Sequence, residues 1–200
     1  MTDTAAPHPT GAQPEHAEIL AATRHWLTRA VIGLNLCPFA KGVHMKGQIR
    51  YAISEATDLE GVLADLETEL RTLADADPEQ LDTTLLILPH AFADFIDYND
   101  ALHFADLLLT QLRLEGTLQI ASFHPHYQFE GTEPDDIENY TNRAPYPILH
   151  LLREASIERA VDAFPDAADI YERNQETLRR LGLEGWREWM ATRDEKHDED

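Results

Sequence analysis

Hydrophobic residues recur along the chain with two different spacings, and the changes between them predict the order of helices and strands. A helix with one buried face carries apolar residues every three or four positions, whereas a half-buried strand carries them at every second position. Short apolar or alternating segments predict strands over 48–54, 84–89, 117–123 and 147–153. The second, "TLLILP", is continuously apolar, which is typical of a central strand covered on both faces.

Helical spacing fills the segments between and around these strands. It predicts a helix over about 15–34, a second from a capping box at Thr57 and Glu60 to Leu73, and a third over about 91–114. Two more helices are expected after the last strand. The predicted order is therefore α-β-α-β-α-β-loop-β-α-α.

Capping and breaking residues mark where these helices are expected to begin and end. Asn35 and Gly116 are suited to ending the first and third helices. Ser156 and Asp166 are expected to cap the last two helices, the second of which ends near Gly182.

This order is typical of a single layered α/β domain with a four-stranded parallel or mixed sheet flanked by helices. A ferredoxin-like α+β sandwich is the alternative. The domain is expected over 15–190. A Pro/Ala/Thr-rich tail over 1–14 and a charged tail over 191–200 are expected to be disordered.

Charge and composition narrow the class of partner. The chain has 37 acidic and 16 basic residues and a net charge of -21, which argues against nucleic acid or an anionic membrane surface as a partner. A single cysteine fits a reducing compartment. No apolar run is long enough to span a membrane, and the first residues lack the pattern of a secretory signal. The expected location is the cytoplasm, and the sequence does not determine the oligomeric state.

Histidines follow two of the predicted strands. His90 comes directly after the second strand, and His124 and His126 follow the third. In open α/β sheets, ligands gather beyond the carboxyl ends of the strands. The loop over 127–146 leaves from the same place, and connections of that length are usually functional. The sequence therefore predicts a site at this edge of the sheet.

Three segments of this acidic chain contain no acidic residue: 19–54, 116–129 and 139–153. At the average frequency the first alone would hold about seven. Buried strands account for part of the bias, since they exclude carboxylates in any protein. If the three segments meet in space, they favour an anionic ligand, such as a carboxylate or phosphate ester.

The residue types in these segments suggest roles. His124 is the candidate general acid/base. The alternative is a purely structural histidine whose ring nitrogens bond backbone groups. Cys37 is a candidate nucleophile, although buried, inert thiols are more common. Arg143 with Asn142 is a candidate anion clamp, unless Arg143 pairs with a carboxylate of the protein. Lys41 and Arg50 are secondary candidates for binding the anion. A Cys/His-assisted hydrolase or transferase is one activity that fits these candidates.

Two other functional classes stay open. The first is a zinc or copper site built from His90, His124 and His126, since imidazole suits both metals. The second is a non-catalytic interaction module that docks through the stretch "CPFAKGVHMKGQIR". No nucleotide-binding, phosphate-cradling or Cys-x-x-Cys motif is present, so no cofactor is evident from the sequence.

Three stretches together resemble the uncharacterised bacterial proteins of domain-of-unknown-function family 1415. They are "LNLCPFAKGVHMKGQIRY", "ASFHPHYQFEGTEPDDIENYTNRAPYPILHLLRE" and "AFPDAADIYERN", and the resemblance covers about 15–182. It implies no established activity. It does imply that Cys37, His124, Asn142 and Arg143 lie in signature stretches of the family. It also adds two neighbours to the ligand-binding candidates, namely Tyr127 and Gln128.

Overall fold

A computed structural model describes residues 12–163 and 169–191 of the chain. Four strands form one sheet in the order β1-β2-β4-β3. The strands are β1 (Ile49–Ile53), β2 (Thr83–Ile87), β3 (Leu118–Phe123) and β4 (Ile148–Arg153). The α-helices are α1 (Ala12–Trp26), α2 (Ala40–Met45), α3 (Leu59–Asp75), α4 (Phe95–Leu112), α5 (Glu154–Ala163) and α6 (Ile170–Ala191). A π-helix, η1 (Leu27–Ile32), continues α1, and a 3-10 helix, η2 (Ile137–Thr141), lies in the loop before β4.

The sheet is mixed, which confirms the predicted α/β class. β1 and β2 are parallel, as expected for a strand-helix-strand unit, whereas β4 runs antiparallel to both of its neighbours, β2 and β3. It follows that β1, β2 and β3 all point the same way, although β4 separates β2 from β3. The carboxyl ends of these three strands share one edge of the sheet with the start of β4.

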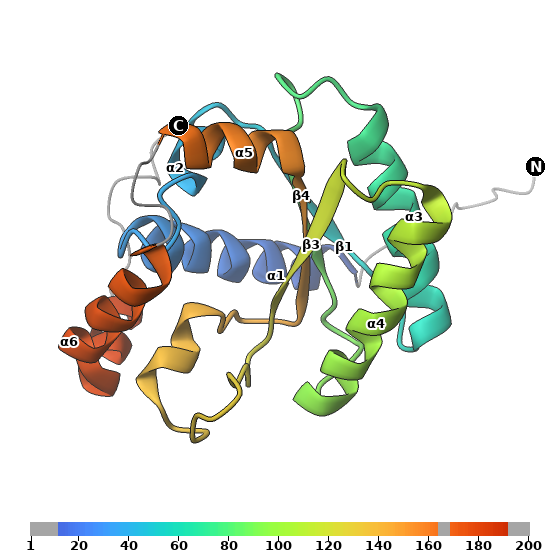
Figure 1. The fold of residues 1–200 in the computed structure, drawn as a ribbon. Helices are drawn as coiled ribbons and strands as arrows, with labels where there is room; N and C mark the ends of the chain where they lie inside the picture. Colours follow the sequence, from blue (N-terminus) through green and yellow to red (C-terminus); the bar gives the residue numbers. More distant parts are fainter. Residues whose placement is uncertain (1–11, 164–168, 192–200) are drawn as a thin grey trace, which may run out of the picture.

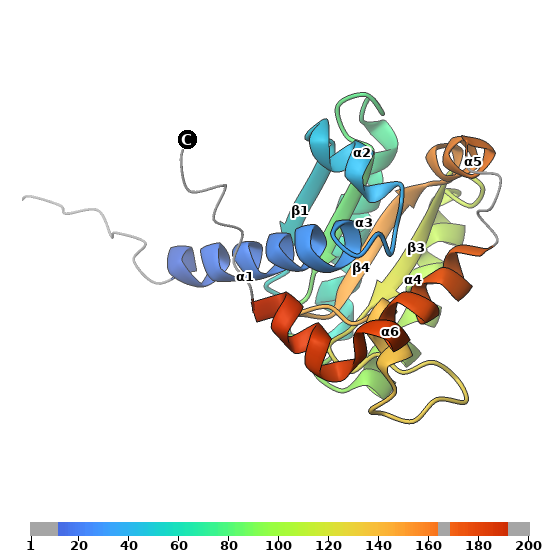
Figure 2. The same cartoon turned by 90° about the vertical axis from the view of Figure 1, so that its left-hand side faces the viewer.

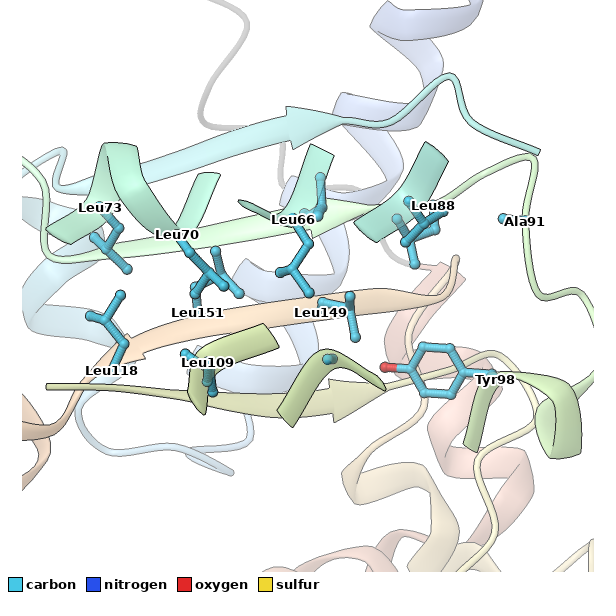
Figure 3. Packing of buried hydrophobic residues seen from close by; sticks show 13 residues of the cluster. Leu66, Leu70, Leu73, Leu88, Ala91, Tyr98, Leu109, Leu118, Leu149 and Leu151 are labelled. Carbon is cyan, nitrogen blue, oxygen red and sulfur yellow. The ribbon is translucent and has the colours of Figure 1, made fainter. Parts of the chain in front are cut away.

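Helices cover both faces of the sheet (Figures 1 and 2). α3 and α4 pack on one face, where leucines of α3 point toward leucines of β4 and the Tyr98 ring closes one end of the cluster (Figure 3). The Tyr98 hydroxyl donates to the Ile148 carbonyl at 2.8 Å, so the buried ring has a polar partner. α1, η1 and α6 pack on the other face, with Trp26, Leu178 and Trp186 among the buried residues.

Several helix boundaries differ from those predicted. The first predicted helix is confirmed, but its last turns widen into η1. Asp58 caps α3 by accepting from the Gly61 N–H, so the predicted capping box at Thr57 is wrong. α5 begins at Glu154, so Ser156 lies inside the helix and the predicted cap at Ser156 is wrong. The Ser156 hydroxyl donates to the Asp82 carboxylate instead.

The C-terminal helix also differs. Gly182, with φ +66°, produces a kink, and α6 continues beyond it to Ala191. The short helix α2 was not predicted, because "AKGVHM" carries too few apolar residues to form a periodic stripe. The expected cap at Asp166 and most of the two expected tails lie outside the described residues, although residues 12–14 belong to α1. No helix in the described ranges is long and apolar enough to cross a membrane.

Candidate functional site

His124 lies at the end of β3, and both nitrogens of its ring are occupied by backbone groups. The side chain is fully buried against the rings of Phe95 and Tyr98. Nδ1 accepts from the His126 N–H at 3.0 Å, so Nε2 carries the proton and donates to the Phe92 carbonyl at 2.9 Å. Burial lowers the pKa of His124, while the Phe92 carbonyl opposes this shift. The geometry is that of a neutral histidine that ties the strand end to the chain before α4.

The loop between β3 and β4 is held together by its own polar side chains. Asn139 is fully buried; its Oδ1 accepts from the Phe129 N–H and the Thr132 hydroxyl, and its Nδ2 donates to the Glu133 carbonyl. Gln128 Nε2 donates to the Thr132 carbonyl at 2.5 Å. Such side-chain bonds replace the ladder that a strand or helix would provide. The loop is therefore long but internally ordered.

The predicted anion clamp takes part in the same scaffold. Arg143 donates to the Tyr127 carbonyl at 3.2 Å and to the Pro134 carbonyl at 2.5 Å, and its guanidinium lies 4.4 Å from the centre of the Tyr140 ring. Asn142 Nδ2 donates to the Ser122 carbonyl, and the Asn142 carbonyl accepts from the His124 N–H. The Tyr127 ring packs against two other aromatic rings, those of Phe95 and Phe129. These groups bind the protein's own backbone and rings.

The three histidines of the predicted metal site do not share an ion-sized space. His90 is exposed and faces carboxylates, with Nε2 3.8 Å from Glu15 and 3.7 Å from Glu55. His126 is exposed, while both nitrogens of His124 are engaged. Within residues 12–163 and 169–191, no group of three His, Cys, Asp or Glu side chains is arranged to hold a metal ion.

Other candidates lie away from the carboxyl edge. Lys41 is on α2, which leads into the start of β1, so it lies toward the opposite edge of the sheet from the loop after β3 (Figure 2). Arg50, near the start of β1, forms a two-pronged ion pair with Glu69 at 2.6 and 3.0 Å, and this partner raises the pKa of Arg50. The structure thus does not gather the acid-free segments around one site.

Cys37 lies in the segment that connects η1 to α2. Its side chain packs against the cluster of apolar residues beneath α1 and α6. Burial raises the pKa of the Cys37 thiol, and hydrogen bonds from the backbone at Phe39 and Ala40 only partly oppose this. A thiol is a weak nucleophile until it is deprotonated. This environment favours a protonated, packed side chain.

A cavity of about 320 Å³ lies between this same connecting segment and the first half of α6. Such a volume is at the lower end of the range for small-molecule pockets. Four lining residues come from the segment after η1: Gly33, Leu34, Asn35 and Pro38. Five come from α6: Ile170, Arg173, Asn174, Thr177 and Arg180.

Local backbone features shape the wall after η1. The wide hydrogen bonds of the π-helix continue into it, since the Gly33 N–H bonds the Thr28 carbonyl and the Leu36 N–H bonds the Val31 carbonyl. A Cβ on Gly33 would lie 2.3 Å from the Arg29 carbonyl oxygen, so only glycine fits there. Asn35 has φ +55°, a left-handed conformation that asparagine tolerates better than most residues. π-Helical turns are frequent at functional sites.

The α6 wall is one face of a helix. Its five residues lie at positions i, i+3, i+4, i+7 and i+10, which place them in one row. Leu178 is fully buried, and Asn174 Nδ2 donates to the Leu36 carbonyl at 2.8 Å. The hydrogen bond of Asn174 links this face of the helix to the segment after η1.

The charge of the lining is the reverse of that of the chain. Among the described residues that line the cavity, the two charged ones, Arg173 and Arg180, are cationic, and none carries a carboxylate. Arg180 forms no hydrogen bond or ion pair with residues in the described part of the chain. This cavity is the strongest candidate for a ligand site.

Comparison with known proteins identifies the family. A family model described as "Protein of unknown function (DUF1415)" matches residues 18–188. The chain belongs to the DUF1415 family. No curated protein and no solved structure matches the chain.

The stretches that resemble the DUF1415 family fall into two structural groups. "LNLCPF" and "DIYERN" supply residues to both walls of the cavity. The stretch from His124 to Arg143 builds the internally bonded loop. The sequence does not mark α6 as a site, because its arginines follow helical spacing and form no recognised motif. The available signal was the row of polar residues at Arg173, Thr177 and Arg180 on one face of the expected helix.

Proposed function

We propose that this DUF1415 protein binds a small anionic compound, a carboxylate or a phosphate ester, in the cavity between residues 33–38 and α6. The observation that carries the proposal is Arg180, which has no partner among the described residues and lies in a cavity whose described lining has two arginines and no carboxylate. The class of ligand is the one expected from the sequence. The proposed place is different, because the edge of the sheet is filled by the loop after β3.

The physical basis is the strength of charge-assisted hydrogen bonds. A guanidinium offers a planar fork of donors that matches a carboxylate or phosphate. Ile170, the first residue of α6, borders the cavity, so the helix dipole adds to the positive potential there. Cys37 and His124 are not part of this proposal, since the first is a packed thiol and the second has both nitrogens occupied.

Two-dimensional amide NMR of the full chain tests the proposal, with pyrophosphate and succinate as probes and sodium chloride matched for ionic strength. We expect saturable shift changes at residues 33–38 and 173–180. Arg180→Gln should weaken binding by about tenfold or more, because a hydrogen bond to a charged group is lost.

Arg187→Gln is the matched control. Arg187 is also an exposed arginine of α6, but it lies beyond the kink at Gly182 and outside the cavity lining. It should leave binding unchanged. Equal effects of the two substitutions, or no saturable shift with either probe, would refute the proposal.

A further inference from the structure

Asn174 offers the cavity a hydrogen-bond acceptor that the protein does not use. Only 6% of the residue is exposed. Its Nδ2 donates to the Leu36 carbonyl, which fixes the orientation of the amide because a carbonyl can only accept. On the other side of the amide, Oδ1 accepts no hydrogen bond from any of the residues the structure describes. Asn174 belongs to the lining of the cavity.

A nearly buried acceptor selects for a donor. In the empty cavity, water can donate to Asn174 Oδ1. A ligand that displaces this water without replacing its hydrogen bond loses affinity. A carboxylate or phosphate oxygen cannot donate, so the anionic group of a ligand cannot satisfy this position. A hydroxyl or an amine of the ligand can.

The order of groups along α6 sets where each part of the ligand lies. Arg173 and Arg180 are two turns apart, a rise of about 10.5 Å along the helix axis. Asn174 and Thr177 lie between them on the same face. The lining therefore places neutral hydrogen-bonding groups in the middle and guanidinium groups toward the ends.

We infer that the ligand is a hydroxylated anion, a polyol phosphate or a hydroxy acid, whose acid group pairs with Arg180 and whose hydroxyl donates to Asn174 Oδ1. This inference rests on the proposed function and specifies the chemistry of that same cavity. Thr177 contributes a second hydroxyl contact one turn from Asn174. The apolar lining residues, Leu34, Pro38 and Ile170, leave room for only a short carbon skeleton in a cavity of about 320 Å³.

Matched ligand pairs test this without altering Asn174, whose substitution would also remove the bond to Leu36. Titration calorimetry of the full chain compares glycerol 3-phosphate with propyl phosphate, and glycerate with propionate. The two pairs distinguish a phosphate from a carboxylate as the acid group. In at least one pair, we expect the hydroxylated member to bind about tenfold or more tightly. Thr177→Val should narrow this difference without removing it, because the Asn174 acceptor is retained.

The outcomes separate the inference from the proposed function. If both members of each pair bind equally and Arg180→Gln weakens both, the inference is wrong and the anion site stands. If no member binds but pyrophosphate does, the inference is likewise wrong. If none of these compounds and neither probe anion binds, the proposed function fails with it.

Discussion

His150 makes the stability of the fold depend on pH. It lies in β4 on the face covered by α1, opposite Leu85 of β2 and Ala121 of β3. The Thr83 hydroxyl donates to the Leu151 carbonyl, so it accepts from His150 Nε2 at 2.7 Å. The proton of the neutral ring is thereby placed on Nε2. Burial lowers the pKa of His150 from 6.5 to about 4, because a second proton would charge the ring in apolar surroundings.

The direction of the pH dependence follows from the pH at which the folded and unfolded chains each bind the proton. The unfolded chain takes up the proton near pH 6.5, whereas the folded chain resists it until about pH 4. Stability from the neutral His150 is therefore complete above pH 6.5 and is lost as the pH falls toward 4. Between about pH 7.5 and about pH 5, this one group should cost about 2 kcal/mol in the free energy of unfolding.

Urea unfolding at the two pH values measures this change in wild type and in His150→Gln, which keeps a donor for Thr83 but does not titrate. The substitution should remove about 2 kcal/mol of the pH dependence. Burial also lowers the pKa of His124, but this contribution is the same in both proteins and cancels. His103→Gln, at an exposed position of α4, is the control, and its free energy of unfolding should change with pH as that of wild type does. If the free energy of unfolding changed with pH by the same amount in wild type and in His150→Gln, the role assigned to His150 would be refuted.

Three further substitutions test the fold around the site. Gly33→Ala should lower the free energy of unfolding by about 1–3 kcal/mol, because the new Cβ clashes with the Arg29 carbonyl. The control Gly42→Ala, where nothing lies within 4 Å of the new Cβ, should leave the free energy of unfolding unchanged or raise it. Equal melting temperatures for the two variants would contradict this prediction. Asn139→Ala should cost about 2–4 kcal/mol and increase amide exchange over 129–139, since three hydrogen bonds are lost; unchanged exchange would count against an ordered loop. Arg153→Met should cost about 2–4 kcal/mol in urea unfolding, because the buried guanidinium bonds three backbone carbonyls; a change below about 0.5 kcal/mol would disprove that role.

Local patterns were sufficient to predict the strands and most helices. "TLLILP" was read as a central strand because it is apolar on both faces, and β2 is paired on both sides and fully buried. The apolar stripe of α3 predicts this helix, and Val62 and three leucines of the stripe are buried. The residues of η1 follow helical spacing and belong to the first predicted helix, but nothing in that spacing predicts its π-helical widening. The six residues of α2 are too few to form a periodic stripe.

The location of the candidate site depends on how strands and helices pair in the fold, which local sequence patterns do not specify. The rule that ligands bind beyond strand carboxyl ends applies where parallel strands diverge and open a crevice. Here β4 is inserted antiparallel between β2 and β3, and the loop from His124 to Arg143 lies at the carboxyl ends of these two parallel strands. The cavity arises only when α6 packs against residues 33–38, which lie more than a hundred positions earlier in the chain. The location of the cavity could not be predicted from the sequence, because it depends on the tertiary fold.

Asn142 also limits how the sheet can grow. β3 is an edge strand, and the bond from the Glu154 N–H to the Thr117 carbonyl sets which of its residues face β4. By this alternation, the Ser122 carbonyl and the His124 N–H point to the open side. Asn142 binds both, so the end of β3 has no free template there for a strand from another molecule. Asn142 thus protects the C-terminal end of this uncharged edge strand from fibre-like association, independently of any ligand.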